Sequence, residues 1–399
     1  MAATNAQLLS EILDQAAQLL KKHKIDLWIT FVRETMLMCD PSFPLVCPLD
    51  MVWQSAFLIS RKGDRIAVVG RYDVENLKRT GAYSEIIPYD ESIRPALVAA
   101  IKKVKPKRIA INTSEGDPAA DGLTHGMHAL LMGILSEAGF AKNVEPAEVF
   151  LNSLRGQKTL SEVARIRRAI RTTEKLYREI GKEIKTGQTE QQLARKLHER
   201  VRELNLETAW DRDLCPAVNT GPDTAIGHAG PGKLRTKRGH LLHFDFGVLQ
   251  DDYCSDLQRN WYLLEQNERR PPEAVHHAWK VARDALLAGA EAMQPGARGW
   301  EVDAAARAYM IAQGFPEYMH AFGHHIGRSA HDGATVLGPR WDRYGNTPYG
   351  LLKAGNCFAI ELGVFVPGRG YIYLEENVLV TESGIEWLSK PQKQLWLVN

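Results

Sequence analysis

The sequence predicts an α/β (α+β) protein with two domains, a smaller one over residues 1–155 and a larger one over residues 156–399. A length of 399 residues is typical of two domains of ordinary size. The first 150 residues alternate between strand-like and helix-like segments, which is typical of a small α/β domain. A helix pair followed by a β-rich stretch then occurs twice, over 161–262 and over 273–380, which indicates two related halves of the larger domain.

The smaller domain is expected to begin with an amphipathic helix, because apolar side chains recur at helical spacing between Leu8 and Leu20. Gly63 lies between two short apolar runs and predicts the turn of a hairpin. Predicted strands lie at Leu27–Phe31, Ala56–Ser60, Arg65–Gly70, Ile86–Tyr89 and Arg108–Asn112, and predicted helices lie near Asp73–Thr80, Ile93–Val104 and Gly122–Ala138. This domain contains no group of residues that indicates catalysis.

The larger domain is expected to follow a junction at residues 150–160. Apolar residues from Val163 to Ile180 recur at helical spacing, and Thr189 is placed to open a second helix. Predicted helices lie from Ser161 to about Ile180 and near Thr189–Leu204, Glu273–Met293 and Trp300–Gln313. The stretches between and after these helices are rich in glycine and aromatic residues, and we expect them to form strands.

The composition excludes several classes of protein. Hydrophobic residues make up 44% of the chain and charged residues 25%, which is ordinary for a globular enzyme. The 50 basic and 48 acidic residues lack the basic excess that is typical of proteins bound to nucleic acid or membrane surfaces. No apolar run approaches the roughly 18 residues of a membrane span. The N-terminal residues do not resemble a signal peptide, and five cysteines without a CxxC pair favour a reducing cytoplasm.

Two strand pairs in the larger domain are each expected to bring two carboxylates face to face. In the first pair, Leu241–Val248 and Tyr253–Tyr262 are strand-like. Asp245 and Asp256 are equidistant from the midpoint of Gln250–Asp251, so an antiparallel pair centred there places them directly opposite each other. Facing carboxylates repel each other, and a fold that keeps such a pair usually binds a cation there.

The second strand pair repeats this arrangement around a turn at residues 367–370. Glu361 and Glu375 each lie seven residues from Gly368, so they also oppose each other across a hairpin. Glu376 points to the other face, which favours a place behind the ligands or on the surface. Chance alternation could explain one such pair of acids, but two pairs inside apolar strands favour a metal site.

Histidines gather in the same part of the chain, where nine of the 13 fall between His228 and His331. His320, His324 and His331 lie in one glycine-rich stretch, which favours chemistry over packing. Four carboxylates and one of these histidines form an oxygen-rich set that suits two divalent cations, most of all Mn²⁺, with Co²⁺ or Zn²⁺ possible. Two such ions activate a water molecule and polarise a carbonyl, which indicates hydrolysis.

With these residues the sequence resembles the pita-bread metallopeptidases, which include methionine aminopeptidase, aminopeptidase P, prolidase and the metal-free creatinase. The resemblance covers nearly the whole chain. It implies a creatinase-type N-terminal domain over 1–155 and a pita-bread catalytic domain over 156–399. It implies five metal ligands, with Asp245 on one ion, Asp256 and Glu375 bridging both, and His324 and Glu361 on the other. Because all five positions are filled, creatinase itself is disfavoured.

The resemblance also implies roles beyond metal binding. It assigns catalysis to Glu361 as a general base, and to His228, His320 and His331 as groups that contact the substrate and the tetrahedral intermediate. Tyr373 is expected to line the substrate pocket, at a position where the family usually has an arginine. Losing a guanidinium removes a partner for a substrate carboxylate. Carboxylate recognition would then shift to another group, such as Arg369 or Arg328, or the substrate differs.

Within the family, the chain is most similar to bacterial and archaeal prolidase. The resemblance therefore implies a cytoplasmic Xaa-Pro dipeptidase in which a hydroxide bridging the two metals attacks the carbonyl before proline. The alternatives are an aminopeptidase P that acts on longer peptides, a non-peptidase hydrolase or lyase, and a non-catalytic binding protein on the same fold. The expected partners are a small peptide substrate and a second copy of the chain, in a homodimer or a higher oligomer, with no nucleic acid and no membrane.

Overall fold

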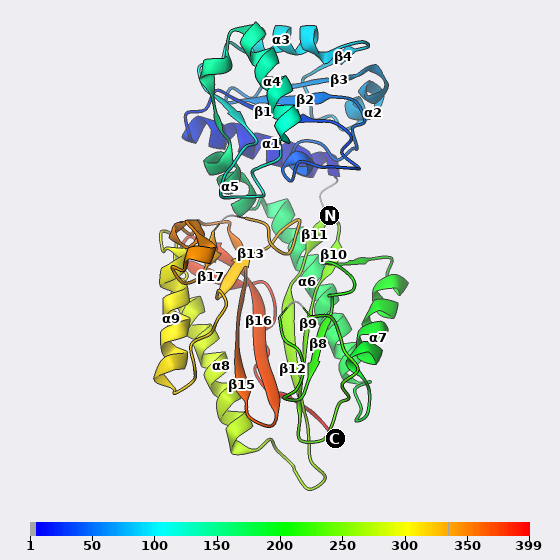
Figure 1. Ribbon diagram of the computed structural model, residues 1–399, viewed down its shortest axis with the longest axis vertical. Coiled ribbons are helices and arrows are strands. Elements are labelled where there is room, and N and C mark those ends of the chain that lie inside the picture. The colour runs from blue at the N-terminus through cyan, green and yellow to red at the C-terminus, as the bar shows by residue number, and fades with distance from the viewer. Residues whose placement is uncertain (1–4, 228, 334) are drawn as a thin grey trace. The chain divides into compact units, whose positions relative to one another are not determined.

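The computed structural model describes residues 5–227, 229–333 and 335–399 (Figure 1). His228, a predicted catalytic and substrate-binding residue, therefore lies outside the described residues. The chain divides into two compact units, one that ends at Arg155 and one that spans Gly156–Asn399. Among the described helices, none has the length and apolar character needed to cross a membrane.

The first unit is built on a six-stranded mixed sheet in the order β4-β3-β2-β1-β5-β6. The apolar faces of α3 and α4 pack against this sheet and form one hydrophobic core with it. The strands are β1 Leu27–Val32, β2 Ser55–Ser60, β3 Arg65–Gly70, β4 Glu85–Tyr89, β5 Ile109–Ile111 and β6 Val144–Pro146. The helices are α1 Asn5–Lys22, α2 Val74–Arg79, α3 Ile93–Val104, α4 His125–Ala138 and α5 Glu148–Gly156, with short 3-10 turns at Phe43–Leu45, Arg71–Asp73 and Ala141–Asn143.

Capping residues set where the helices of this unit begin. The Ser92 hydroxyl accepts a hydrogen bond from the Arg94 amide at 3.2 Å at the start of α3. The Thr124 hydroxyl accepts from the Met127 amide at 3.3 Å, so α4 begins at His125, three residues later than the predicted start at Gly122.

The second unit has two helix pairs, a nine-stranded sheet in the order β14-β13-β15-β16-β12-β9-β8, and a small sheet of β11, β10 and β7. Strands β17 and β18 join the large sheet by pairing with β16 and β12. The helices are α6 Leu160–Gly181, α7 Glu190–Glu203, α8 Glu273–Glu291 and α9 Gly299–Ala312, with 3-10 turns at Asp342–Tyr344 and Thr347–Tyr349. The strands are β7 Glu207–Thr208, β8 Ala217–Thr220, β9 Leu241–Phe246, β10 Val248–Gln250, β11 Tyr253–Cys254, β12 Leu257–Leu263, β13 Gly323–His325, β14 Val336–Leu337, β15 Cys357–Val366, β16 Gly370–Thr381, β17 Gly384–Trp387 and β18 Trp396–Val398.

Each half of this unit carries its own helix pair. In Figure 1, α7 lies beside β8, and α8 lies beside β15 and β16. Apolar side chains of α8 and α9 form one core with β15 and β16. The predicted order, a helix pair followed by strands and then repeated, is confirmed, and the two halves meet in a single sheet.

The first acidic hairpin has a different register from the one predicted. Asp245 pairs with Gln258 and not with Asp256. The turn consists of Asp251 and Asp252, whose φ angles are 53° and 65°. A type I′ hairpin turn needs positive φ at both central positions, which aspartate tolerates, and the turn therefore lies one residue later than predicted. Because this moves the register by two residues, Asp245 and Asp256 still share one face of the sheet.

The second acidic hairpin has the predicted register, since Glu361 pairs with Glu375. Val366 pairs with Gly370 at the end next to the turn. The two hairpins then join through β12 and β16, where Gln258 pairs with Glu375. This junction was not predicted, and it brings the strands of both acidic pairs next to one another.

Candidate metal centre

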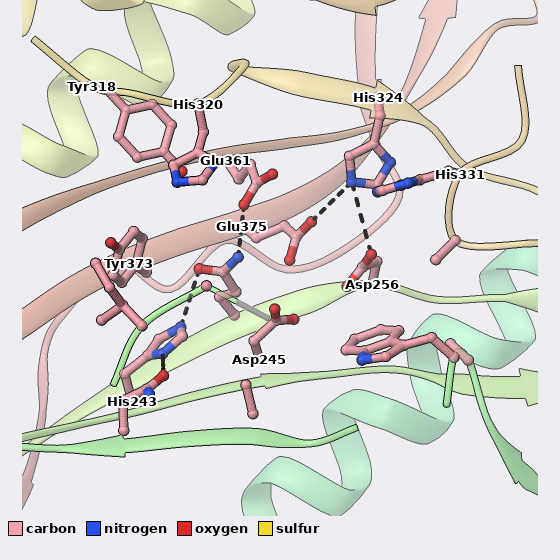
Figure 2. A pocket seen from close by; sticks show the side chains of 18 of the residues that line it. His243, Asp245, Asp256, Tyr318, His320, His324, His331, Glu361, Tyr373 and Glu375 are labelled. Atoms are coloured by element: carbon pink, nitrogen blue, oxygen red, sulfur yellow. Dashed lines mark hydrogen bonds and ion pairs between the residues drawn. The ribbon is translucent and has the colours of Figure 1, made fainter. Parts of the chain in front are cut away.

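Five neighbouring strands bring the predicted metal ligands into one pocket of about 450 Å³ (Figure 2). The ligands alternate with core residues along their strands, so their side chains share one face of the sheet. They are His324 on β13, Glu361 on β15, Glu375 on β16, Asp256 immediately before β12, and Asp245 on β9.

Three of these side chains lie close enough to share one cation. His324 Nε2 is 3.9 Å from Asp256 Oδ2 and 3.8 Å from Glu375 Oε1. One ligand atom from each of the three lies within 4.8 Å of the other two. Among the described residues, Asp245 Oδ1, Asp256 Oδ1 and Glu375 Oε2 are buried without a hydrogen-bond partner. Burying such oxygens alone costs free energy, so this oxygen-rich set with one imidazole fits a divalent cation.

Burial and crowding change the pKa values of these groups in the direction expected of a metal site. Burial raises the pKa of Glu361 to about 7. Burial, and then the charge of Glu361, raise the pKa of Asp256 to about 8. Burial and the neighbouring acids also raise the pKa values of Asp245 and Glu375. Burial lowers the pKa of His324 to about 3, which keeps its imidazole in the neutral form that binds metals.

Gln258 is a further polar residue of the pocket, and its role was not predicted. Its Nε2 donates a hydrogen bond to Glu361 Oε2 at 2.9 Å. Its Oε1 lies 3.1 Å from His243 Nε2, and His243 Nδ1 lies 3.1 Å from Asn219 Oδ1. Gln258 thus connects a predicted ligand to a buried histidine. The signal in the sequence is its position two residues after Asp256, which places both side chains on one face.

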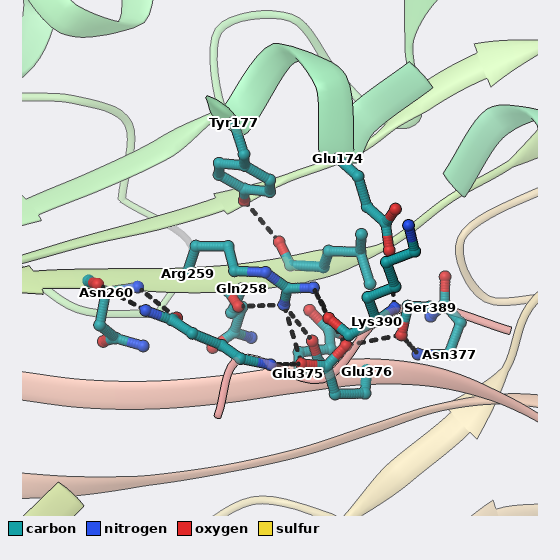
Figure 3. Close-up of polar contacts among 12 residues, drawn as sticks. Glu174, Tyr177, Gln258, Arg259, Asn260, Glu375, Glu376, Asn377, Ser389 and Lys390 are labelled. Carbon is teal, nitrogen blue, oxygen red and sulfur yellow. Dashed lines mark hydrogen bonds and ion pairs between the residues drawn. The ribbon is translucent and has the colours of Figure 1, made fainter. Parts of the chain in front are cut away.

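A buried ion pair lies behind the centre (Figure 3). Arg259 Nη1 is 3.0 Å from Glu376 Oε1, and both side chains are at most 3% exposed. The same guanidinium donates to the carbonyl oxygen of Glu375 at 3.1 Å. Asn377 Nδ2 donates to the carbonyl oxygen of Asp256 at 2.7 Å. Glu376 is therefore not a surface residue, and these contacts hold the main chain of two predicted ligands.

Two of the predicted catalytic histidines line the pocket. The His331 ring meets the His324 ring edge to face, with 4.2 Å between centroids. The His320 ring lies 5.6 Å from the ring of Tyr318, which also lines the pocket (Figure 2). Tyr318 was not predicted, because it lies in an irregular segment whose side-chain directions no periodicity predicts.

Tyr373 lines the pocket, as predicted. Its ring lies over Gly363, the residue that pairs with it on β15, where a Cβ atom would come within 2.0 Å of the ring. The ring is 5.2 Å from the His243 ring and stacks on Tyr371 at 5.7 Å. Glycine at position 363 therefore lets the tyrosine lie flat against the strand.

Neither arginine that we considered as a substitute carboxylate partner lines the described pocket. Arg369 donates to the carbonyl oxygen of Gly239 at 2.8 Å. The Arg328 guanidinium lies over the Tyr253 ring, 5.1 Å from its centroid. Both side chains are thus engaged with other parts of the fold, and the described lining contains neither lysine nor arginine.

Solved structures share this fold. The Xaa-Pro dipeptidase from Bacillus anthracis aligns with a TM-score of 0.75 and 22% identity, covering 98% of this chain and 100% of that protein. The X-Pro aminopeptidase from Thermotoga maritima aligns with a TM-score of 0.73 and 22% identity, covering 94% of this chain and 98% of that protein. For the prolidase from Pyrococcus horikoshii the TM-score is 0.69 at 20% identity, with coverage of 96% and 99%. At these identities the likeness shows the fold alone.

Sequence comparison places the chain in a family. An uncharacterized peptidase from Staphylococcus aureus is 26% identical over 341 residues, which are 85% of this chain and 88% of that protein. The model of metallopeptidase family M24 matches residues 164–382, a range that contains all five predicted ligands. The predicted α/β fold and the resemblance to the pita-bread metallopeptidases are thereby confirmed. The chain belongs to metallopeptidase family M24.

Proposed function

We propose that this metallopeptidase hydrolyses Xaa-Pro dipeptides with two divalent metal ions held at the candidate metal centre. The ligands would be Asp245, Asp256, His324, Glu361 and Glu375. The observation that carries the proposal is the set of unpartnered buried carboxylate oxygens beside His324 Nε2. When bound, the ions would activate a water molecule and polarise the scissile carbonyl.

The side chains around the centre support the movement of protons. Gln258 fixes Glu361 through the hydrogen bond to its Oε2, which leaves the carboxyl group oriented toward the pocket. Glu361 would act as the general base, because its carboxylate lines the pocket where the water molecule would be activated. His320 and His331 would donate hydrogen bonds to the carbonyl oxygen of the substrate, or a proton to the proline nitrogen as it leaves.

The proposed substrate class rests on the pocket lining and on the relatives. Tyr318 and Tyr373 present neutral aromatic surface, which suits the apolar ring of a proline residue. Structures with this fold carry the names Xaa-Pro dipeptidase, X-Pro aminopeptidase and prolidase. Both observations favour a peptide with proline after the scissile bond.

A second candidate function is an aminopeptidase that acts on longer Xaa-Pro peptides. The described pocket lining contains no lysine or arginine that could pair with the free carboxylate of a dipeptide. A longer peptide has an amide at that position and needs no such cation. This observation favours longer Xaa-Pro peptides as the alternative substrates.

The proposal includes Mn²⁺ as the native metal, a homodimer and a cytoplasmic location. Oxygen-dominated ligation with one imidazole suits Mn²⁺, with Co²⁺ or Zn²⁺ as alternatives. All five cysteines are free, which agrees with a reducing compartment.

One assay separates the candidates. The purified protein is stripped of metal, reloaded with Mn²⁺, and given Ala-Pro and Ala-Pro-Ala in parallel. Cleavage of the dipeptide alone supports a dipeptidase. Cleavage of the tripeptide indicates an aminopeptidase that acts on longer peptides. If neither peptide is cleaved, the peptidase proposal is wrong and a different hydrolase, a lyase or a binding protein takes its place.

A further inference from the structure

A buried ion pair on α9 holds the segment that carries His320. Residues 318–322 precede β13 and belong to no helix or strand, so their backbone polar groups need other partners. The side chains of Asp303 and Arg307 are partners for several of these backbone groups. These two residues lie one helical turn apart on α9 and are only 2% and 9% exposed.

The geometry of this ion pair is bidentate. Arg307 Nε donates to Asp303 Oδ2 at 2.8 Å, and Arg307 Nη2 donates to Asp303 Oδ1 at 2.7 Å. The planar fork of the guanidinium matches the two carboxylate oxygens and fixes its remaining N–H directions. Those directions point at the segment before β13.

Three alternate residues of that segment bond to the ion pair. Arg307 Nη1 donates to the carbonyl oxygen of Tyr318, and Arg307 Nη2 donates to the carbonyl oxygen of His320 at 2.9 Å. Asp303 Oδ1 accepts from the amide of Phe322 at 3.2 Å. The main chain is therefore fixed at His320 and two residues to either side, which determines where its ring enters the pocket.

From this geometry we infer that Asp303 and Arg307 are positioning residues for His320, and act on substrate turnover through it. The inference rests on the proposed function, in which His320 contacts the substrate. Neither Asp303 nor Arg307 lines the described pocket. Their effect on catalysis therefore passes through the main chain that they hold.

The test variant is Arg307→Lys, which keeps a positive charge beside Asp303. A lysine has no planar fork, so it cannot hold the carboxylate and both carbonyl oxygens at once. We expect kcat/KM for the cleaved Xaa-Pro peptide to fall by about 10- to 100-fold, as a displaced substrate contact does. Asp303→Asn is the second variant, for use if Arg307→Lys does not fold.

A double-mutant cycle tests whether the effect passes through His320. Adding Arg307→Lys to His320→Ala should cause no further loss, whereas adding it to His331→Ala should cause the full loss again. The matched control is Arg165→Lys, since Arg165 is also a buried helical arginine that donates to a carbonyl oxygen, that of Asp251 at 3.1 Å. This control should leave kcat/KM unchanged.

Histidine NMR supplies a readout that does not depend on activity. In protein labelled with ¹⁵N-histidine, the ring signals of His320 are those lost in His320→Ala. Arg307→Lys should shift these signals and leave those of His331 in place, whereas Arg165→Lys should shift neither.

Unchanged His320 signals in Arg307→Lys would overturn the inference. So would an equal loss of kcat/KM in both histidine backgrounds, because that outcome indicates a general defect of the fold. If the wild-type protein cleaves no Xaa-Pro peptide, the proposed function fails, and the NMR signals alone decide whether the ion pair positions His320.

Discussion

At the scale of single residues, the candidate centre depends on the groups that orient its carboxylates. Gln258 pairs in register with Asp245 on one side and with Glu375 on the other, and its amide donates to Glu361. Its strand β12 therefore lies between the strands of Asp245 and Glu375. Replacing a residue that orients a metal ligand typically lowers metal affinity or activity by about 10- to 100-fold.

We expect Gln258→Leu to weaken Mn²⁺ binding by about 10- to 100-fold, because Glu361 loses its hydrogen-bond donor. Titration of the metal-stripped protein against a competing chelator measures this change. Gln250→Leu is the control, since Gln250 bonds to Thr172 outside the pocket. Unaltered affinity in Gln258→Leu would show that Gln258 does not orient the centre.

The sequence allowed the acids to be predicted but not every residue around them. Alternation places Asp245 and Asp256 on one face whether or not the register shifts by two residues. The predicted common face therefore did not depend on the exact position of the turn. Gln258 has the same alternation, yet a neutral amide carries no charge repulsion that would single it out. Tyr318 lies outside any strand, so no register predicts its direction.

At the scale of elements, the site is built by the way two hairpins meet. The glycine turn at Gly368 fixes the register of β15 and β16, and this register could be predicted. Pairing between β12 and β16 joins segments more than 100 residues apart, and no local pattern encodes it. On β15, the missing side chain of Gly363 leaves room for the ring of its partner Tyr373.

We expect Gly363→Ala to lower the free energy of unfolding by about 1–3 kcal/mol, because the new Cβ atom meets the Tyr373 ring. Urea unfolding measures the change. The same substitution in a Tyr373→Ala background should cost much less, since the three nearest atoms all belong to that ring. An equal cost in both backgrounds would mean that the ring is not what position 363 accommodates.

At the scale of the whole molecule, a formal net charge of +2 conceals a buried cluster of four acids. The division into two units could be anticipated from length and from the two successive types of pattern. The raised pKa values of the four acids could not be anticipated from the sequence. They depend on burial, which raises the pKa values of all four groups.

These pKa values make the stability of the metal-free protein depend on pH. The pKa of Asp256 is raised to about 8 and that of Glu361 to about 7, above their values of about 4 in an unfolded chain. A raised carboxyl pKa stabilises the fold at low pH, and this contribution is lost as the pH rises through the folded value. Buried histidines have the opposite effect on stability, but only below about pH 6.5. In that range the same histidines become protonated in the unfolded chain.

We therefore expect the free energy of unfolding of the metal-free protein to fall between about pH 6.5 and pH 8. Urea unfolding in the presence of a chelator measures it. Mn²⁺ should remove most of the fall, because the ions favour the charged carboxylates, and Asp256→Asn should reduce the slope without metal. A stability that rises over this range without metal would contradict the crowding of the four acids.

The central claim is that five side chains hold two metal ions, and calorimetric titration of Mn²⁺ into the metal-stripped protein tests it most directly. We expect two ions per chain in the wild type. In Asp256→Ala, which removes one of the five proposed ligands, we expect binding at the centre to be lost. A wild-type stoichiometry of one or none, or an unchanged titration in Asp256→Ala, would contradict the two-metal centre.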